Sequence, residues 1–539
     1  MERKNYIVAV DLGSSSVVVA VGETCDGGPL RVAAIVSKPV EGVNAGRIDN
    51  IELVSRAIRD AVSEVEAQLG IRITEAYAGI SGDFVRCARH TDHVFVSDHQ
   101  TGVNQKDVES LFDRMRNVQA PDDETIMERI PQNYVVDDNQ EVKNPVGSFG
   151  KKLSSTFNFI LCHKTPVQRL DMALKRLSIR MLGVFADALA TPAAILQPEE
   201  MEEGVAVVDL GAGVTDVTVY YRNVVRYTVS IPMGASAINR DIRAMGVPEK
   251  HIENLKRKYG SAVSELAPED KLIRVNGRTT RDAKDILLKN LATVIEARAT
   301  DIAEFVMQEI KDSGYASKLS YGIVLTGGSA ALKDLDELFR RVTQMEVRVA
   351  LPDVGIDDAS IDFVADPAFA TAVGILIKGA EQGACAVVEH ASTPAQTAAS
   401  GRAHVPVSDL RSAAAVPPRG PVPPVPQPQP QPRQPRTAQP QAVPGVRTAP
   451  VRPVQPSPAQ QSQAAAPVPP SRPSVQPVRP QAPAQPEPMP RQGFVPPEPE
   501  EEEPVVIGPR RKRDWSSIFK KVVGSVAGFD GEGADDEEI

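Results

Sequence analysis

Two short segments of this chain carry the residue types that hold phosphate groups, and they share one pattern. DLGSS stands at 11–15 and DLGAGVT at 209–215, each between two β-rich runs. Small residues let backbone N–H groups approach phosphate oxygens, and hydroxyl groups add donors. An ordinary β-hairpin explains either turn alone, but two matching turns 198 residues apart favour a paired phosphate clamp. The candidate phosphate ligands are Gly13, Ser14, Ser15, Gly211, Gly213 and Thr215.

An aspartate ends the strand before each turn, Asp11 in the first and Asp209 in the second. Hydrated Mg²⁺ prefers one or two carboxylates together with water and phosphate oxygens. The two carboxylates therefore predict a magnesium ion bound with a polyphosphate, between loops that face each other across a cleft.

A third segment, LTGGSA at 325–330, follows a strand and is expected to open a helix. Gly327, Gly328 and Ser329 would let the backbone pass close to the base and ribose of a nucleotide. A structural Gly-Gly turn before a helix is equally common, and this segment is neither a Walker A loop nor GxGxxG.

Two charged residues in HIENLKRKYG, Glu253 and Lys256, lie one helical turn apart on one face. Taken alone, such a pair is more often a surface salt bridge than a ligand site. The sequence shows no Ser-His-Asp, Cys-His or His-metal arrangement, and the four cysteines are far apart, as in a reducing cytosol.

The C-terminal segment has the spacing of a short amphipathic helix. A basic run at 510–513 precedes it, and Lys520 and Lys521 lie on its polar side. This combination predicts a helix lying in the plane of an anionic membrane surface, although docking on the protein's own core or in a partner's groove stays open. The membrane-facing residues are Trp515, Ile518, Phe519, Lys520, Val522, Val523 and Val526.

The elements that would position the two loops occur in a repeated order. Three β-rich runs open the chain, and a helix over 52–69 follows, ending at Gly70. After a small α+β insertion at 84–162, a helix at 165–180 with Thr165 as its cap restarts the series. Three more β-rich runs then surround the second loop, between 205 and 234.

The remaining globular part is mainly helical. Long helices are expected around 248–259 and 280–312, and a helix at 368–380 closes the core. Beyond it the composition changes, because 33 of the 46 prolines lie between 394 and 509. Such a segment buries too little apolar surface to offset its ordering entropy, so a disordered linker is expected.

Composition excludes several function classes. The 539 residues carry a net charge of −10, which argues against a general nucleic-acid binder. The chain has no run of about 18 apolar residues, so no membrane-spanning helix is expected. The N-terminus enters a strand with no apolar signal stretch.

Together these residues resemble the actin, Hsp70 and sugar-kinase superfamily, and within it the FtsA family of bacterial cell-division proteins. The resemblance covers about 4–383 and the terminal helix. IPQNYVVDDNQEVKNPVGSFGKKL at 130–153 is similar to the FtsA-type insertion, and IENLKRKYG is similar to the family's adenosine-contacting Glu-x-x-Lys helix. One departure is Gly234-Ala235, where many relatives carry Gly-Gly.

The resemblance implies an α/β, actin-like two-lobed fold with duplicated RNase H-like subdomains. The first lobe would comprise 1–83 and 163–200, interrupted by the insertion at 84–162. The second would comprise 201–383, with a small helical subdomain at about 233–315. The linker would span 384–509, the membrane-targeting helix 510–529 and an acidic tail 530–539.

The resemblance also implies ATP and Mg²⁺ in the cleft and a scaffold that polymerises on the inner membrane at the division septum. It would tether FtsZ filaments of the Z-ring there through the FtsZ C-terminal peptide and recruit later divisome proteins. Arg298 and Asp301 are the candidate FtsZ contacts, by position. Asp187 stands where a water-orienting residue would be sought, but at most weak ATP hydrolysis is expected.

Three alternatives remain at this point. A sugar-kinase-like phosphotransferase would need a catalytic aspartate and a sugar pocket, and no such motif is visible. An Hsp70-like chaperone would need a β-rich domain after residue 385, where the chain is rich in proline. A type IV pilus assembly ATPase-like protein would share the insertion, but the amphipathic helix argues against it.

Overall fold

The structure is a computed structural model that describes residues 5–24, 28–98, 100–137, 140–276, 283–389 and 507–508. The chain divides into two units, residues 1–395 with 501–539, and residues 396–500. The second unit, the expected membrane helix and the acidic tail lie outside the described residues.

The first lobe is built on a five-stranded sheet. β1 (Asn5–Leu12), β2 (Ser16–Thr24) and β3 (Arg31–Pro39) form an antiparallel meander. β7 (Glu75–Ile80) pairs parallel to β1, and β12 (Arg180–Ala186) pairs parallel to β7. The strand order is therefore β3-β2-β1-β7-β12.

The second lobe repeats this topology. β13 (Val205–Leu210), β14 (Thr215–Tyr221) and β15 (Val224–Ile231) form the meander. β18 (Ile323–Thr326) pairs parallel to β13, and β19 (Val347–Val349) pairs parallel to β18. The order β15-β14-β13-β18-β19 matches the first lobe strand for strand, which confirms the actin-like duplication inferred from the sequence.

Helices bury their apolar faces against these sheets, and their termini follow local sequence rules. In α1 (Ile51–Leu69) the Asn50 side chain accepts from the first free N–H groups, and Gly70 ends the helix at a φ of 67°. The other principal helices of this lobe are α3 (Lys164–Lys175), α4 (Asp187–Ile195) and α11 (Ala370–Gln382). The short helix α5 (Pro198–Glu203) lies against β14 of the second lobe, and its Glu200 pairs with Arg348 of β19.

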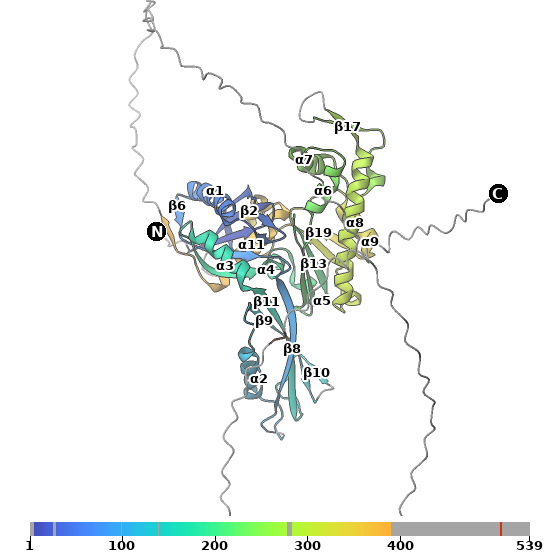
Figure 1. The fold of residues 1–539 in the computed structure, drawn as a ribbon. Coiled ribbons are helices and arrows are strands. Elements are labelled where there is room, and N and C mark those ends of the chain that lie inside the picture. The colour runs from blue at the N-terminus through green and yellow to red at the C-terminus, as the bar shows by residue number, and fades with distance from the viewer. Residues whose placement is uncertain are drawn as a thin grey trace, which may run out of the picture. The chain divides into compact units, whose positions relative to one another are not determined.

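The second lobe carries its helices in one small subdomain and on one sheet face. They are α6 (Ser236–Ala244), α7 (Glu249–Tyr259), α8 (Leu288–Asp312) and α9 (Leu335–Thr343). A hairpin of β16 (Leu272–Val275) and β17 (Lys284–Leu287) lies at the start of α8. Figure 1 shows α6, α7 and β17 grouped at the top of this lobe.

Three local expectations were wrong. Thr165 does not cap α3, because the helix begins at Lys164 with His163 at its N-cap. Residues 284–287 form β17 and not the first turn of a long helix, since they pair with β16. The Gly327–Gly328 segment does not open a helix directly, because α9 begins only at Leu335.

The insertion supplies four strands and one helix. β8 (Val85–Phe95), β9 (Glu124–Val136), β10 (Gln140–Val142) and β11 (Lys152–His163) pair in the order β10-β9-β11-β8, and α2 (Gln105–Asn117) packs on them. In Figure 1 this subdomain projects from the two lobes.

The insertion interrupts the sequence of the first lobe, but its sheet is continuous with the sheet of the second lobe. Arg86 of β8 pairs with Val229 of β15, which makes one nine-stranded sheet. The buried Asn158 amide donates to the carbonyls of Val225 and Arg226 on β15, at 3.3 and 3.1 Å. These contacts bind the insertion to the second lobe as well as to the first.

The chain after α11 returns to the first lobe. β20 (Val387–Glu389) pairs antiparallel with β6 (Ile71–Ile73), so ordered structure extends past residue 384, where the linker was expected to start. Within the described residues no single helix is long and apolar enough to span a membrane. Only the bent pair 358–364 and 367–382 meets the length and composition requirement.

Candidate functional site

The two Asp-Leu-Gly turns have the same backbone geometry. In the first, the Gly13 N–H donates to the Ser16 carbonyl at 2.9 Å, and in the second the Gly211 N–H donates to the Val214 carbonyl at 3.0 Å. Each turn joins the first two strands of its lobe's meander. The sequence repeat is therefore a structural repeat at the level of single hydrogen bonds.

The two turns also meet each other. A Cβ added to Gly213 would lie 2.4 Å from the Ser14 Oγ and 3.2 Å from the Ala45 Cα. The Ser14 Oγ accepts in turn from the Gly46 N–H at 3.2 Å. Only a glycine at 213 allows the second loop to approach the first this closely. Ser15, the residue after Ser14 in the first loop, is exposed.

Four carboxylates gather beneath these loops: Asp11 and Asp209 as expected, with Asp187 and Asp216. Burial, followed by the charges of Asp209 and Asp216, raises the pKa of Asp11 to about 7. Burial and the Asp209 charge raise the pKa of Asp216 to about 7, despite its hydrogen bonds from Ser81 and Ser230. Burial also raises the pKa of Asp187, and the other three aspartates add to the effect.

Asp209 is held by the helices that join the two lobes. Its Oδ2 accepts from the Thr191 hydroxyl of α4 at 2.9 Å and from the Thr371 hydroxyl of α11 at 2.8 Å. A Cβ on Gly327, whose φ is +86°, would lie 2.2 Å from the Asp209 Oδ1. Burial raises the pKa of Asp209, while the two threonine hydroxyls oppose this rise.

The carboxylate cluster fits a cation. The Asp187 Oδ1 is buried and has no hydrogen-bond partner, which leaves an acceptor for a metal-bound water or another ligand donor. Among the described residues no three His, Cys, Asp or Glu side chains are close enough to enclose a metal ion by themselves. The residues present thus fit a hydrated Mg²⁺ that takes its remaining ligands from phosphate and water.

Thr215 lies differently from the other expected phosphate ligands. Its side chain is fully buried, and its hydroxyl donates to the Met233 carbonyl at 2.7 Å. This hydrogen bond fixes the turn at 233–236, which packs on the second loop: the Ala235 N–H donates to the Gly211 carbonyl at 3.1 Å. Thr215 therefore shapes the loop, and its hydroxyl is already engaged.

The third glycine-rich segment lies beside the second loop. The Ser329 N–H donates to the Leu210 carbonyl and its hydroxyl donates to the Gly211 carbonyl, both at 3.1 Å. The Gly327 N–H donates to the Pro367 carbonyl at 3.2 Å, and a Cβ on Gly328 would reach only the Ala368 side chain, at 3.4 Å. The segment thus packs on the second Asp-Leu-Gly loop. Its expected contact with the base and ribose of a nucleotide stays a prediction.

Glu253 and Lys256 lie on α7, and Glu253 contacts α6, the helix that follows the turn packed on the second loop. The Lys256 Nζ, which is almost buried, lies 2.8 Å from the Glu253 Oε2, and the Asn239 amide of α6 donates to the same oxygen at 2.9 Å. Burial raises the pKa of Glu253, but the hydrogen bond and charge of Lys256 outweigh it and lower the pKa overall. The Asn239 Oδ1 is buried without a partner, so it can accept from a ligand N–H or O–H.

Two expected sites lie elsewhere. Arg298 and Asp301 belong to an ion triad on α8 and α6: the Arg298 guanidinium lies 2.7 Å from Asp241 and 2.8 Å from Asp301. About a third of the Arg298 side chain is exposed, so the triad reaches the surface. The membrane-facing residues of the terminal helix lie outside the described part of the chain.

Asp216 and Asp187 show what sequence reasoning missed at this site. Asp216 was not singled out, although an acidic residue within the β-rich run TDVTVYY is an unusual strand residue that could have drawn notice. Asp187 was singled out only by its place in the connecting segment.

Comparison with known proteins gives consistent matches. A family model described as cell division protein FtsA matches residues 206–374, and one described as the SHS2 domain inserted in FTSA matches residues 82–161. The cell division protein FtsA of Pseudomonas aeruginosa is 30% identical over 383 residues, which is 71% of this chain and 91% of that protein. FtsA of Escherichia coli is 29% identical over 386 residues, which is 70% and 91% of the two chains.

Solved structures with similar folds include a PilM–PilN type IV pilus biogenesis complex. It is 14% identical, with a TM-score of 0.47, and covers 69% of this chain and 98% of that one. MreB5 of Spiroplasma citri bound to ADP is 13% identical, with a TM-score of 0.42, and covers 70% and 99%.

Proposed function

Because this chain belongs to the FtsA family of cell division proteins, we propose that it is an actin-like scaffold of the divisome that binds Mg·ATP between its lobes. The observation that carries this proposal is the pair of matching turns that meet above four carboxylates, three of them buried and that of Asp11 partly exposed. Nothing else in the described residues explains why so many carboxylates gather without cationic partners.

Each part of the site has a proposed role. The backbone N–H groups of Ser14, Ser15 and Gly213 would hold the phosphate oxygens, while those of Gly13 and Gly211 close the two turns. Asp11 and Asp209 would orient the water shell of a bound Mg²⁺, which would supply positive charge to offset that of the phosphates and the carboxylates. The adenosine lies against Gly327, Gly328 and Ser329 on one side and Glu253 and Lys256 on the other.

The bound nucleotide then holds the lobes in one relative position, because its ligands come from both. We propose that this position permits polymerisation with further copies of the chain. Fast hydrolysis is not part of the proposal.

The family membership also supports the partners proposed for this chain. It would lie on the cytoplasmic face of the inner membrane at the septum, attached through the helix at 510–529. The FtsZ C-terminal peptide would bind near Arg298 and Asp301, and the chain would recruit later division proteins. A single short helix binds a membrane weakly, but a polymer presents many helices at once and so binds firmly.

The nucleotide site is tested with Gly213→Ala. Its new Cβ would collide with the Ser14 side chain and push the loops apart, so the Kd for Mg·ATP should rise about tenfold or more. Titration calorimetry measures the Kd for ATP, and its repetition with EDTA shows how much of the affinity depends on the metal ion. Gly508→Ala is the matched control, because a Cβ there meets open space. Equal ATP affinity in both variants and the parent protein would refute the clamp.

A further inference from the structure

The chain returns to the inserted subdomain shortly before its basic C-terminal run. Ile507 and Gly508 are described there, and the Ile507 N–H donates to the Gln119 carbonyl at 3.0 Å. Gln119 follows α2 and precedes β9, so the contact lies at one edge of the insertion. Residues 119 and 507 are far apart in sequence, and the contact is therefore a tertiary one.

The Ile507 side chain fills an apolar pocket, and only 6% of it is exposed. Burial of an aliphatic side chain among close-packed partners is the main source of affinity at such a contact. The pocket is lined by side chains at or below 3% exposure from the end of α2 and from β11: Met115, Val118, Phe157, Phe159 and Leu161.

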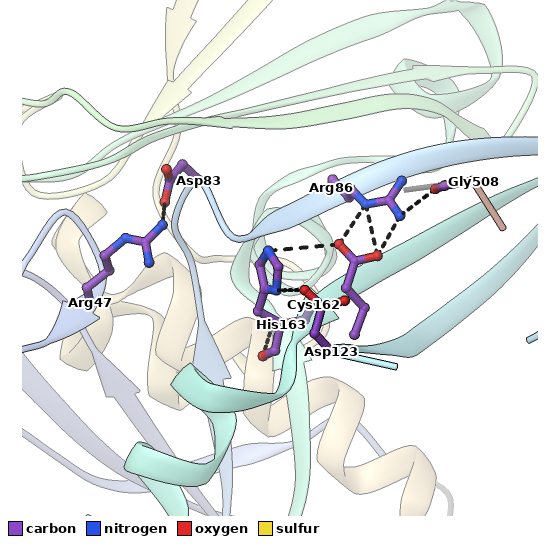
Figure 2. Close-up of polar contacts among 8 residues, drawn as sticks. Arg47, Asp83, Arg86, Asp123, Cys162, His163 and Gly508 are labelled. Atoms are coloured by element: carbon purple, nitrogen blue, oxygen red, sulfur yellow. Dashed lines mark hydrogen bonds and ion pairs between the residues drawn. The ribbon is translucent and has the colours of Figure 1, made fainter. Parts of the chain in front are cut away.

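A polar contact holds the next residue. The Arg86 guanidinium donates to the Gly508 carbonyl at 3.1 Å, and its Nε donates to the buried Glu124 carboxylate at 2.8 Å. Figure 2 shows the Arg86 guanidinium directed at the Gly508 carbonyl. Because Glu124 already fixes the guanidinium, little side-chain freedom is lost when Gly508 binds.

We infer that this pocket, with Arg86, is a docking site for the chain's own segment at 507–508. Whatever path residues 390–506 take, the basic run beginning at Arg510 then starts within about 7 Å of the insertion, two residues beyond Gly508. The docking does not depend on the proposed function. Its consequence, that a membrane-binding helix emerges beside the insertion, rests on that proposal.

Amide hydrogen exchange of the full-length protein, without lipid or nucleotide, tests the docking. Ile507→Asp would place a charge in the apolar pocket and should release the segment. Exchange should then become about tenfold faster in peptides that cover 505–509 and faster in those that cover 115–121. Unchanged exchange in both regions would overturn the inference.

Two controls and one dilution series accompany this variant. Ile507→Leu keeps the apolar side chain and Gly508→Ala adds a Cβ in open space, so both should retain parental protection. Unchanged exchange in α8 shows that Ile507→Asp remains folded. Protection that falls on dilution of the parent protein would mean that another copy supplies the segment, and it would overturn docking within one chain.

Discussion

The four aspartates beneath the two Asp-Leu-Gly loops, of which Asp11 is partly exposed and the other three are buried, repel one another when no cation is present. Desolvation and mutual repulsion both favour their neutral forms, so the folded state binds protons that the unfolded state releases. Asp11 shows in which direction stability changes with pH, since its pKa is about 7 in the folded protein and 3.8 for the free side chain. Its contribution therefore destabilises the fold increasingly as the pH rises from about 4 to about 7, and remains constant above that range.

Asp11→Asn should remove this penalty. Without nucleotide or metal, the variant should be more stable than the parent by about 2 kcal/mol at pH 8, since solvent screens part of the repulsion at this partly exposed side chain. The difference should shrink towards pH 5. Thermal unfolding across this pH range measures it, and a difference that does not change with pH would contradict the role of repulsion.

Individual site residues could be predicted where backbone chemistry required a residue type. Gly213 was predictable because only glycine permits the close approach to Ser14. The engaged hydroxyl of Thr215 was not, because its partner, the Met233 carbonyl, is placed by packing between segments and not by local sequence. The same holds for Asp216, whose hydroxyl partners Ser81 and Ser230 come from other strands and turns.

At the scale of elements, α4 and α11 connect the lobes and cross at very small residues. A Cβ on Gly374 would lie 2.1 Å from the Ala190 carbonyl oxygen, so the two helix backbones touch there. The same helices supply the hydroxyls that hold Asp209. The crossing therefore couples the position of Asp209, the proposed metal ligand, to the relation between the lobes.

Gly374→Val should force this crossing apart. We expect a loss of about 3 kcal/mol in the free energy of unfolding, together with weaker binding of Mg·ATP as Thr371 shifts from Asp209. Denaturant unfolding and calorimetry measure the two effects. Ile377→Val on the same helix is a control for side-chain loss away from the crossing. Unchanged stability in Gly374→Val would show that the helices separate easily.

Elements with strong periodicity were predictable, and those fixed by pairing were not. Helix α1 matched its expectation to its C-cap at Gly70, because its apolar stripe and cap are both local signals. Strand β17 was read as helix, because a four-residue segment that pairs only with β16 carries little local signal. The duplication predicted that the two lobes share one topology, but the strand order itself came from the structure.

At the scale of the whole molecule, the first proposal to test is membrane attachment. Deletion of residues 510–539 should leave the Kd for Mg·ATP unchanged and abolish cosedimentation with anionic vesicles, because the apolar face and basic run are removed together. Vesicles of neutral lipid provide the electrostatic control. A truncated protein that still sediments with anionic vesicles would place the membrane contact elsewhere.

The partner site is tested by Arg298→Ala. Loss of the guanidinium should weaken binding of the FtsZ C-terminal peptide about tenfold and leave ATP affinity unchanged, because the ion triad lies on α6 and α8 at the surface. Fluorescence anisotropy with a labelled peptide measures this affinity. Arg243→Ala removes an exposed arginine of α6 and is the matched control. Equal peptide affinity in both variants would exclude the triad as the contact.

The pairing of β8 with β15 has a mechanical consequence. The insertion is covalently part of one lobe, yet its sheet is hydrogen-bonded to the other through Arg86, Val229 and Asn158. Any rotation between the lobes must therefore bend this sheet or reorient the insertion as a lever. If nucleotide binds between the lobes as proposed, thermodynamic reciprocity means that a load applied to the insertion would change the nucleotide affinity by the same coupling free energy.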